Sequence, residues 1–238
     1  MRQKRIKDVE KKVLPYSAYL VTDPEAQKGH WRSVFSKQCR IFEPEKRKLY
    51  LEIGCGKGLF IKTLSSENHD ALYLAAEGQM SVAYRALTRA AGTYNAVKSG
   101  FLIREDDVPK PNNLLLMRAY IFTPRDYFAL GEVNGIYLNF SDPWPKSRHE
   151  KRRVTAPEYL AAYRDILHPG GFLHLKTDND ALFDYSEQTI RDAEGFQIVR
   201  VTRDLHRSAF AEENVLTEYE RKWMNLNRKI KYLLAIKN

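Results

Sequence analysis

The sequence predicts an α/β protein built on a doubly wound, mostly parallel sheet of about seven strands, with a basic arm at the N-terminus. Three observations support this prediction. Short apolar runs alternate with segments of helical periodicity from residue 49 onward. The first of these runs leads directly into a glycine-rich turn, which is typical of ligand sites at the carboxyl edge of parallel sheets. With 43% hydrophobic residues, the 238-residue chain can bury a full core.

The elements follow in order along the chain. Residues 1–48 have weak periodicity and end in a charged stretch, so we expect an arm or short helical extension outside the sheet. A single domain, residues 49–238, is expected to follow. Its apolar runs predict strands within 49–53, 71–77, 113–120, 135–140, 171–177, 196–205 and 231–238. Helical spacing predicts helices at 59–66, 79–91, 156–167 and 180–193, and Pro and Asp predict a loop at 98–112.

The charge of the chain favours a polyanionic partner. Lys and Arg number 39 against 30 Asp and Glu, a net charge of +9. Residues 1–50 hold 13 basic and 6 acidic residues, and the cluster 146–153 holds five basic residues and one acid. Nucleic acid attracts such segments because each neutralised phosphate releases a counterion. An isolated basic cluster is more often a solvated surface, so the motif before this one matters.

Composition also excludes several classes of protein. The two cysteines, Cys39 and Cys55, form neither a disulfide framework nor a Cys-x-x-Cys metal motif. We therefore expect a reducing, cytoplasmic setting and no metal. No run approaches the roughly 20 apolar residues of a membrane span, and the N-terminus is polar instead of carrying a signal-peptide core. We expect a monomer or homodimer.

The glycine-rich turn predicts a nucleoside-binding loop. It reads Glu52-x-Gly54-x-Gly56-x-Gly58, so it lacks the next glycine of the dinucleotide fingerprint and the Lys-Ser/Thr pair of a P-loop. Glu77 ends the second strand, where a carboxylate can accept hydrogen bonds from both ribose hydroxyls. The alternative reading is a structural turn, and Glu77 argues against it.

The segment 135–153 is the most specific stretch of the chain. A predicted strand delivers Asp142 to its carboxyl end, and two prolines stiffen the loop around Trp144. A ring next to a carboxylate is suited to a purine, which stacks on the ring and donates from its edge to the carboxylate. For a bare Asp-Pro-Trp the alternative, a tight turn with a core Trp, would be preferred.

Four separated stretches, LEIGCGKG, NFSDPWPK, LHLKTDN and TEYE, together resemble the bacterial single-chain tRNA (guanine-N7-)-methyltransferase family. This is a Rossmann-like, class I S-adenosylmethionine-dependent family, and the resemblance runs from about Trp31 to the last residue. It implies methyl transfer from S-adenosylmethionine to N7 of a tRNA guanosine, the variable-loop guanosine at position 46. The implied cofactor is S-adenosylmethionine and the implied partner is tRNA.

The resemblance also implies residue roles. The cofactor would be bound by Glu52, Gly54, Gly56, Gly58, Glu77 and Asp142, and Asp142 would also be the catalytic residue. The residues that match substrate positions are Lys146, Asp178, Thr217, Glu218, Tyr219 and Glu220. The residues that match the RNA-contacting loop are Arg148, His149, Lys151, Arg152 and Arg153. Near the adenine ring the family carries an acid-containing pair, whereas Ala119 and Tyr120 stand in this neighbourhood. Backbone groups could serve instead, and reduced cofactor affinity is the alternative.

Two other functions compete with this hypothesis. An exocyclic-amine methyltransferase carries an Asp/Asn-Pro-Pro-aromatic loop similar to Asp142 to Trp144, but its second proline is missing here. A non-catalytic RNA-binding subunit could retain the fold, although intact Glu52, Glu77 and Asp142 argue against it. Cys55 lacks a histidine motif that would make it a nucleophile.

Overall fold

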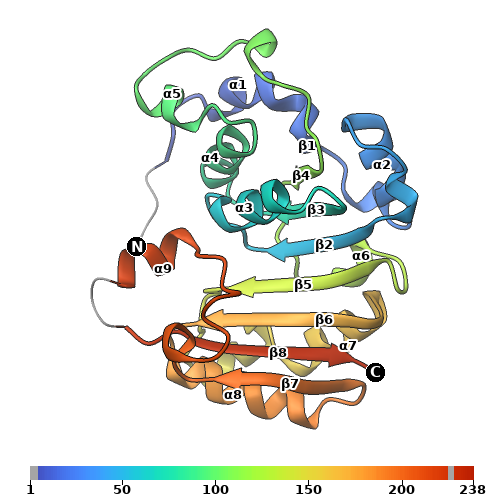
Figure 1. Cartoon of the computed structure of the whole chain (residues 1–238), viewed down its shortest axis with the longest axis vertical. Helices are drawn as coiled ribbons and strands as arrows, with labels where there is room; N and C mark the ends of the chain where they lie inside the picture. Colours follow the sequence, from blue (N-terminus) through green and yellow to red (C-terminus); the bar gives the residue numbers. More distant parts are fainter. Residues whose placement is uncertain (1–4, 225–227) are drawn as a thin grey trace. The chain divides into compact units, whose positions relative to one another are not determined.

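The computed structural model describes residues 5–224 and 228–238 and divides into two compact units, Met1–Ile121 and Phe122–Asn238 (Figure 1). Both units combine helices with a sheet, so the predicted α/β class is confirmed. Across the described residues the strands number eight, four in each unit, compared with the expected seven or so. No helix within these residues has the length and apolarity needed to cross a bilayer.

Unit 1 is built on four parallel strands. They are β1 (Leu20–Val21), β2 (Lys48–Ile53), β3 (Ala71–Ala76) and β4 (Leu114–Met117), in the order β1-β4-β3-β2. The α-helices are α1 (Val9–Val13), α2 (Trp31–Gln38), α3 (Leu59–Glu67), α4 (Met80–Ala90) and α5 (Tyr94–Lys98). The 3₁₀ turns are η1 (Leu14–Tyr19), η2 (Glu25–Gln27), η3 (Pro44–Lys46) and η4 (Glu105–Asp107).

The apolar run of β3 explains its central place in unit 1. All six of its residues are buried, because β2 and β4 cover both edges and helices cover the faces. Leu74 pairs with Leu51 on one side and Leu115 on the other. The core of the unit continues into the aromatic pair Tyr16 and Tyr84, whose rings meet edge to face at 5.9 Å.

Part of our expectation for residues 1–48 was wrong. Leu20 and Val21 pair in parallel with Leu116 and Met117, so this segment contributes a strand to the sheet. A two-residue strand has no periodicity that the sequence could reveal. The boundary after residue 48 stays a prediction. Lys98 ends α5, and residues 99–112 hold one short turn, η4, and are otherwise irregular, as expected of a loop.

Unit 2 contains the second set of four strands. They are β5 (Val133–Asn139), β6 (Leu167–Thr177), β7 (Phe196–Thr202) and β8 (Lys231–Lys237), in the order β5-β6-β8-β7. β5 and β6 are parallel, whereas β8 is antiparallel to both β6 and β7. The helices are α6 (Pro124–Tyr127), α7 (Pro157–Ile166), α8 (Asp180–Asp192) and α9 (Glu218–Met224), and the 3₁₀ turns are η5 (Ser147–Arg152) and η6 (Leu205–Arg207). Over both units, four of these strand pairs are parallel and two are antiparallel, so the strand pairing is mostly parallel, as predicted.

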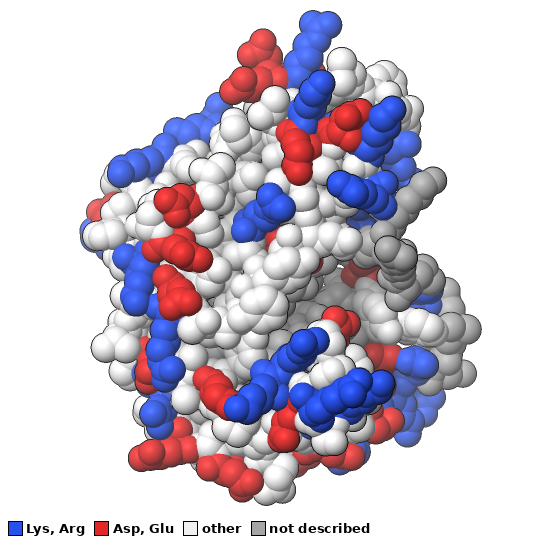
Figure 2. Space-filling model, turned by 180° about the vertical axis from the view of Figure 1, so that it is seen from behind, with Lys and Arg blue, Asp and Glu red and all other residues white. Residues whose placement is uncertain are grey.

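Charged side chains are distributed over both units. Figure 2 shows basic and acidic side chains interspersed over one face of the molecule. Such a mixed surface is ordinary for a globular protein, so the basic excess alone does not identify a binding site. The sites are instead identified by the geometry around the motifs.

Candidate functional site

The glycine loop lies in unit 1 between β2 and α3. Gly54, Gly56 and Gly58 have φ of +73°, +58° and +75°, a region that other residues enter only with strain. The N–H of Gly54 donates to the carbonyl of Ala76 at 2.9 Å, which ties the loop to the end of β3. Around Gly54 and Gly56 an added Cβ would meet nothing within 4 Å, so a ligand can approach the backbone there.

Gly58 is required for a different reason. It caps α3, and an added Cβ would lie 3.0 Å from the Cβ of Ala86 on α4. The missing side chain therefore allows α3 and α4 to pack closely beside the loop. The third glycine of the motif sets helix packing, while the first two leave the loop open.

Glu77 follows β3 and points to the glycine loop. Its Oε2 accepts the N–H of Gly56 at 3.2 Å, and its Oε1 accepts the N–H of Gln79 at 2.8 Å. Burial raises the pKa of Glu77, and the hydrogen bonds from Gln79 and Gly56 oppose that rise. Each carboxylate oxygen keeps a second lone pair, so the group can still accept from two ligand hydroxyls.

Two further side chains lie at the base of the loop. Glu52 is 2% exposed and occupies the penultimate position of β2, opposite Ala75. The Cys55 thiol is buried, and that burial, together with the charges of Glu52 and Glu77, raises its pKa well above the usual range. A thiol that resists ionisation is a poor nucleophile, so Cys55 serves as a small packing residue.

Tyr120 lies in the region where the family carries an acid near the adenine ring, and the sequence alone did not assign it a role. Its ring lies directly against Gly78, where an added Cβ would be 2.3 Å from a ring carbon. Gly78 follows Glu77, and the Glu77 N–H donates to the carbonyl of Met117 at the end of β4. Tyr120 is 59% exposed, so a ligand can reach its side chain beside Glu77.

In unit 2, Asp142 lies in the loop that follows β5 and is exposed. The loop leaves the sheet sharply, since Phe140 and Trp144 have φ of +52° and +41°. The N–H of Phe140 donates to the carbonyl of Lys176 at 2.8 Å, which fixes the start of the loop to β6. Such left-handed bulky residues are strained, and strain of this kind concentrates at functional loops.

The basic cluster 146–153 forms η5 and its flanks. The Arg152 guanidinium lies 5.0 Å from the ring centre of Trp144, and His149 meets the same ring edge to face at 5.6 Å. Arg153 lies over Tyr185 at 4.3 Å and its Nε donates to the carbonyl of Trp144. The exposed members of the cluster are Lys146, Arg148, Lys151 and Arg152, whereas His149 and Arg153 are partly buried. Most cations of the cluster therefore face solvent, and Arg152 does so while it contacts Trp144.

Asp178 follows β6 and is held by two residues near α9. It accepts hydrogen bonds from the Arg228 guanidinium and, at 3.3 Å, from the hydroxyl of Tyr219. The ring of Tyr219 packs at 4.6 Å from that of Phe140 and at 5.6 Å from that of Trp223. Asp178 and Tyr219, two predicted substrate residues, are thus brought together.

The remaining predicted substrate residues begin α9. The N–H of Thr217 donates to Oε2 of Glu220 at 2.9 Å, and the N–H of Glu220 donates to Oγ1 of Thr217 at 3.0 Å. This reciprocal pair is a capping box. Glu218 lies half-buried within the same turn. Glu220 is fully buried and pairs with Lys176, so its geometry suits holding the segment in place.

Sequence reasoning missed Lys176 and Phe140. Lys176 has a readable signal, because a lysine inside the apolar run of β6 must find a partner once it is buried. Phe140 gave no such signal. Within the described part of the chain, no group of three or more His, Cys, Asp or Glu residues is arranged to hold a metal ion.

Comparison with known proteins places these sites in context. The family model described as "Putative methyltransferase" matches residues 46–233. The tRNA (guanine-N(7)-)-methyltransferase of Lachnoclostridium phytofermentans is 38% identical over 219 residues, which cover 92% of this chain and 91% of the relative. The tRNA (guanine-N(7)-)-methyltransferase of Geobacillus thermodenitrificans is 39% identical over 212 residues, 89% of this chain and 86% of the relative.

Solved structures share the fold at much lower identity. An antibiotic-related methyltransferase superposes with a TM-score of 0.54 at 14% identity, over 80% of this chain and 87% of its own. The 16S rRNA methyltransferase KamB superposes with a TM-score of 0.53 at 14% identity, over 100% of this chain and 96% of its own. At such identities the similarity concerns the fold alone.

Proposed function

This chain belongs to the tRNA (guanine-N7-)-methyltransferase family, and we propose that it transfers a methyl group from S-adenosylmethionine to N7 of a tRNA guanosine. The proposal that the protein binds S-adenosylmethionine rests on the position of the Glu77 carboxylate. The N–H groups of Gly56 and Gln79 hold this carboxylate at the open glycine loop. We assign the variable-loop guanosine as the target by the family resemblance.

The residues of unit 1 suit a nucleoside that has two ribose hydroxyls and no phosphate. The faces of Gly54 and Gly56 are open to a ligand, and the spare lone pairs of Glu77 can accept from both hydroxyls. The exposed ring of Tyr120 lies in the place of the family's usual acid and can stack on adenine. Glu52, buried at the end of β2, is proposed to orient the methionine end.

In unit 2, the residues are proposed to bind and orient the guanosine. Asp142 and Asp178 carry carboxylates that can accept hydrogen bonds from the guanine N–H edge. Lys146 and the exposed cations of the basic cluster are placed to bind phosphate, which positions the RNA without reading its sequence. Thr217 and Glu220 hold the turn that carries Tyr219 beside Asp178.

Methyl transfer to N7 requires the protein mainly to orient the two reactants. S-adenosylmethionine, when bound, supplies a methyl group on a cationic sulfur. The in-plane lone pair of N7 forms the new N–C bond while the C–S bond breaks and its electron pair stays on sulfur. Because N7 carries no proton, no general base is needed, and Asp142 acts by fixing the base and by electrostatics. The product guanine carries the positive charge that the sulfur has lost.

The experiment combines the protein, methyl-labelled S-adenosylmethionine and bulk tRNA, and then maps the labelled nucleoside. We expect 7-methylguanosine in the variable loop. A tRNA with 7-deazaguanosine at that position should bind with nearly normal affinity and accept no methyl group, because the attacking atom has become carbon. Methylation of the deaza substrate would instead identify an exocyclic-amine methyltransferase. If neither tRNA becomes labelled, the remaining hypothesis is a non-catalytic RNA-binding subunit.

A further inference from the structure

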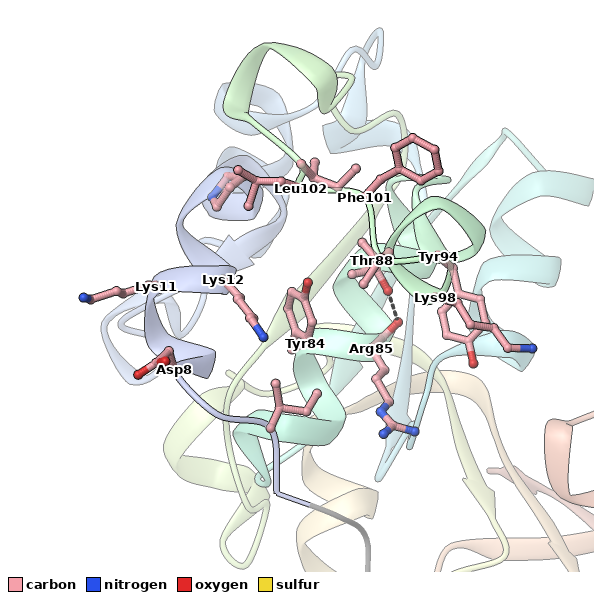
Figure 3. Close-up of a pocket in the computed structure, with 15 residues that line it drawn as sticks. Asp8, Lys11, Lys12, Tyr84, Arg85, Thr88, Tyr94, Lys98, Phe101 and Leu102 are labelled. Carbon is pink, nitrogen blue, oxygen red and sulfur yellow. Dashed lines mark hydrogen bonds between the residues drawn. The ribbon is translucent and has the colours of Figure 1, made fainter.

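A cavity of about 690 Å³ lies in unit 1 among α1, α4, α5 and the segment that follows α5 (Figure 3). The residues that line it belong neither to the glycine loop nor to the turn of Glu77. Its size is within the range of sites that hold a nucleotide-sized ligand. None of the functional roles assigned above uses this cavity.

Four cations surround the cavity. They are Lys11 and Lys12 on α1, Arg85 on α4 and Lys98 at the end of α5. Among the residues that the structure describes, none of the four forms an ion pair, and the carboxylate of Asp8 is the one acidic side chain in the lining. The excess of positive charge is therefore available to an anionic ligand.

The walls of the cavity carry aromatic and apolar side chains. Figure 3 shows Lys12 pointing toward Tyr84, with Phe101 and Leu102 at the opposite rim. Phe101 is 70% exposed and Leu102 is 84% exposed, although both belong to residue types that favour burial. The ring of Tyr94 already contacts a planar cation, because the Arg89 guanidinium lies 4.2 Å from the centre of that ring. Aromatic faces with cations at the rim are the chemistry that binds unpaired nucleotides.

We propose that this cavity, which shares no residue with the glycine loop or the turn of Glu77, is a second RNA-binding site that takes one unpaired nucleotide of the tRNA. The base packs against Phe101, and the flanking phosphates contact Lys12 and Lys98. The inference rests on the proposed function for the identity of the polyanion. Charge complementarity and the exposed aromatic ring select single-stranded RNA over a neutral ligand.

The first test removes charge and compares the salt dependence of tRNA binding. The variant Lys12→Ala/Lys98→Ala is matched by Lys28→Ala/Lys37→Ala, which removes two exposed lysines of the same unit outside the cavity. Loss of two single-strand phosphate contacts should flatten the plot of log K against log salt by roughly 1.4. The control pair should keep the parent slope, and S-adenosylmethionine affinity should stay the same in both.

The second test removes the ring. Phe101→Ala should weaken tRNA binding at least about fivefold, whereas Phe101→Trp should preserve it, because stacking needs an aromatic face. Phe42→Ala is the control, since Phe42 is 76% exposed in the same unit and does not line the cavity. An effect of the lysine pair without an effect of Phe101→Ala would overturn the nucleotide site and leave a general polyanion surface.

The outcomes separate this inference from the proposed function. If the parent methylates tRNA and both the lysine pair and Phe101→Ala bind tRNA like their controls, the cavity is not an RNA site and the methyltransferase assignment stands. If the parent neither binds nor methylates tRNA, both proposals fail. Reduced tRNA binding in the cavity variants, with intact cofactor binding, supports the second site.

Discussion

The ammonium of Lys176 and the carboxylate of Glu220 form an ion pair of 2.7 Å in which both side chains are completely buried. Lys176 also donates to Oδ1 of Asn214 and to the carbonyl of Val215, so its three protons are satisfied. Burial alone would raise the pKa of Glu220, but Lys176 and the N–H of Thr217 outweigh it and lower that pKa. The pair fixes the start of α9 to β6.

Removing one member of this pair should destabilise the protein. Glu220→Gln or Lys176→Met leaves a buried charge without its counter-charge, and we expect a loss of about 3–5 kcal/mol in the free energy of unfolding. The double variant Lys176→Met/Glu220→Met should lose less than either single one, since no charge is then left in the core. Urea unfolding measures all three, and equal stability of the single variants and the parent would contradict the role.

Glu77→Ala should weaken S-adenosylmethionine binding by about 1–3 kcal/mol, the range for polar groups left unpaired in a buried site. The carboxylate also supports Gly56, so the loop loses one of its hydrogen bonds. Glu67→Ala removes an exposed carboxylate on α3 and is the control. Calorimetry that finds the parent affinity in a folded Glu77→Ala protein would remove Glu77 from the site.

Gly78→Ala should weaken cofactor binding by displacing the ring of Tyr120. An added methyl group would lie 2.3 Å from that ring, so the ring must move. Tyr120→Phe keeps the aromatic face and should bind normally, whereas Tyr120→Ala should bind more weakly by about 0.5–1.5 kcal/mol. In the Tyr120→Ala background, Gly78→Ala should have little further effect on the cofactor Kd. Additive losses would show that the two residues act independently.

The exposed cations of the basic cluster should contribute to the salt dependence of tRNA binding. Arg148→Ala/Lys151→Ala keeps the contact of Arg152 with the Trp144 ring and the hydrogen bond of Arg153 to the Trp144 carbonyl. It should flatten the plot of log K against log salt by up to about 0.9 per lost duplex phosphate contact. Cofactor affinity should remain that of the parent. An unchanged slope would make the cluster a solvated surface.

Stability should fall as the pH drops through the ordinary range of histidine. Burial, and then the charge of Lys176, lower the pKa of His174 well below 6.5, so the unfolded chain binds a proton that the folded one excludes. The full contribution is present above about pH 6.5, and up to about 1.4 kcal/mol is lost per pH unit below it. His174→Phe keeps a ring between Tyr137 and Tyr232 and should remove this part of the slope. The exposed His69→Phe should not.

The sequence motifs predicted which residues lie at the ends of strands. The contacts between those residues follow from how the strands pair in the sheet. Glu77 meets the glycine loop because β2 and β3 are parallel neighbours, and the alternation of strands and helices predicted that parallel direction. Tyr120 had no readable role, since its contact with Gly78 depends on where the chain goes after β4. A local pattern identifies positions on a strand, whereas contacts across loops depend on tertiary packing.

Long-range side-chain pairing and the reversed direction of β8 could not be predicted from the sequence. Lys176 and Glu220 are 44 residues apart, and nothing local to either one names the other. The apolar alternation of β8 predicts a strand but is the same in either orientation, so its antiparallel pairing with β6 could not be read. The two-residue strand β1 is too short for any period.

The position of β8 between β6 and β7 also constrains how the protein can fold while it is being synthesised. All strand pairs of unit 1 lie within residues 20–117 and can form early, whereas β7 has no neighbour in the described sheet until residues 231–237 have left the ribosome. Sixty residues separate the end of β6 at Thr177 from the end of β8 at Lys237, and at about 5–20 residues per second their synthesis takes roughly 3 to 12 seconds. During that time the nascent chain carries an apolar β6 edge open to incorrect partners, so chaperone dependence should be concentrated in unit 2.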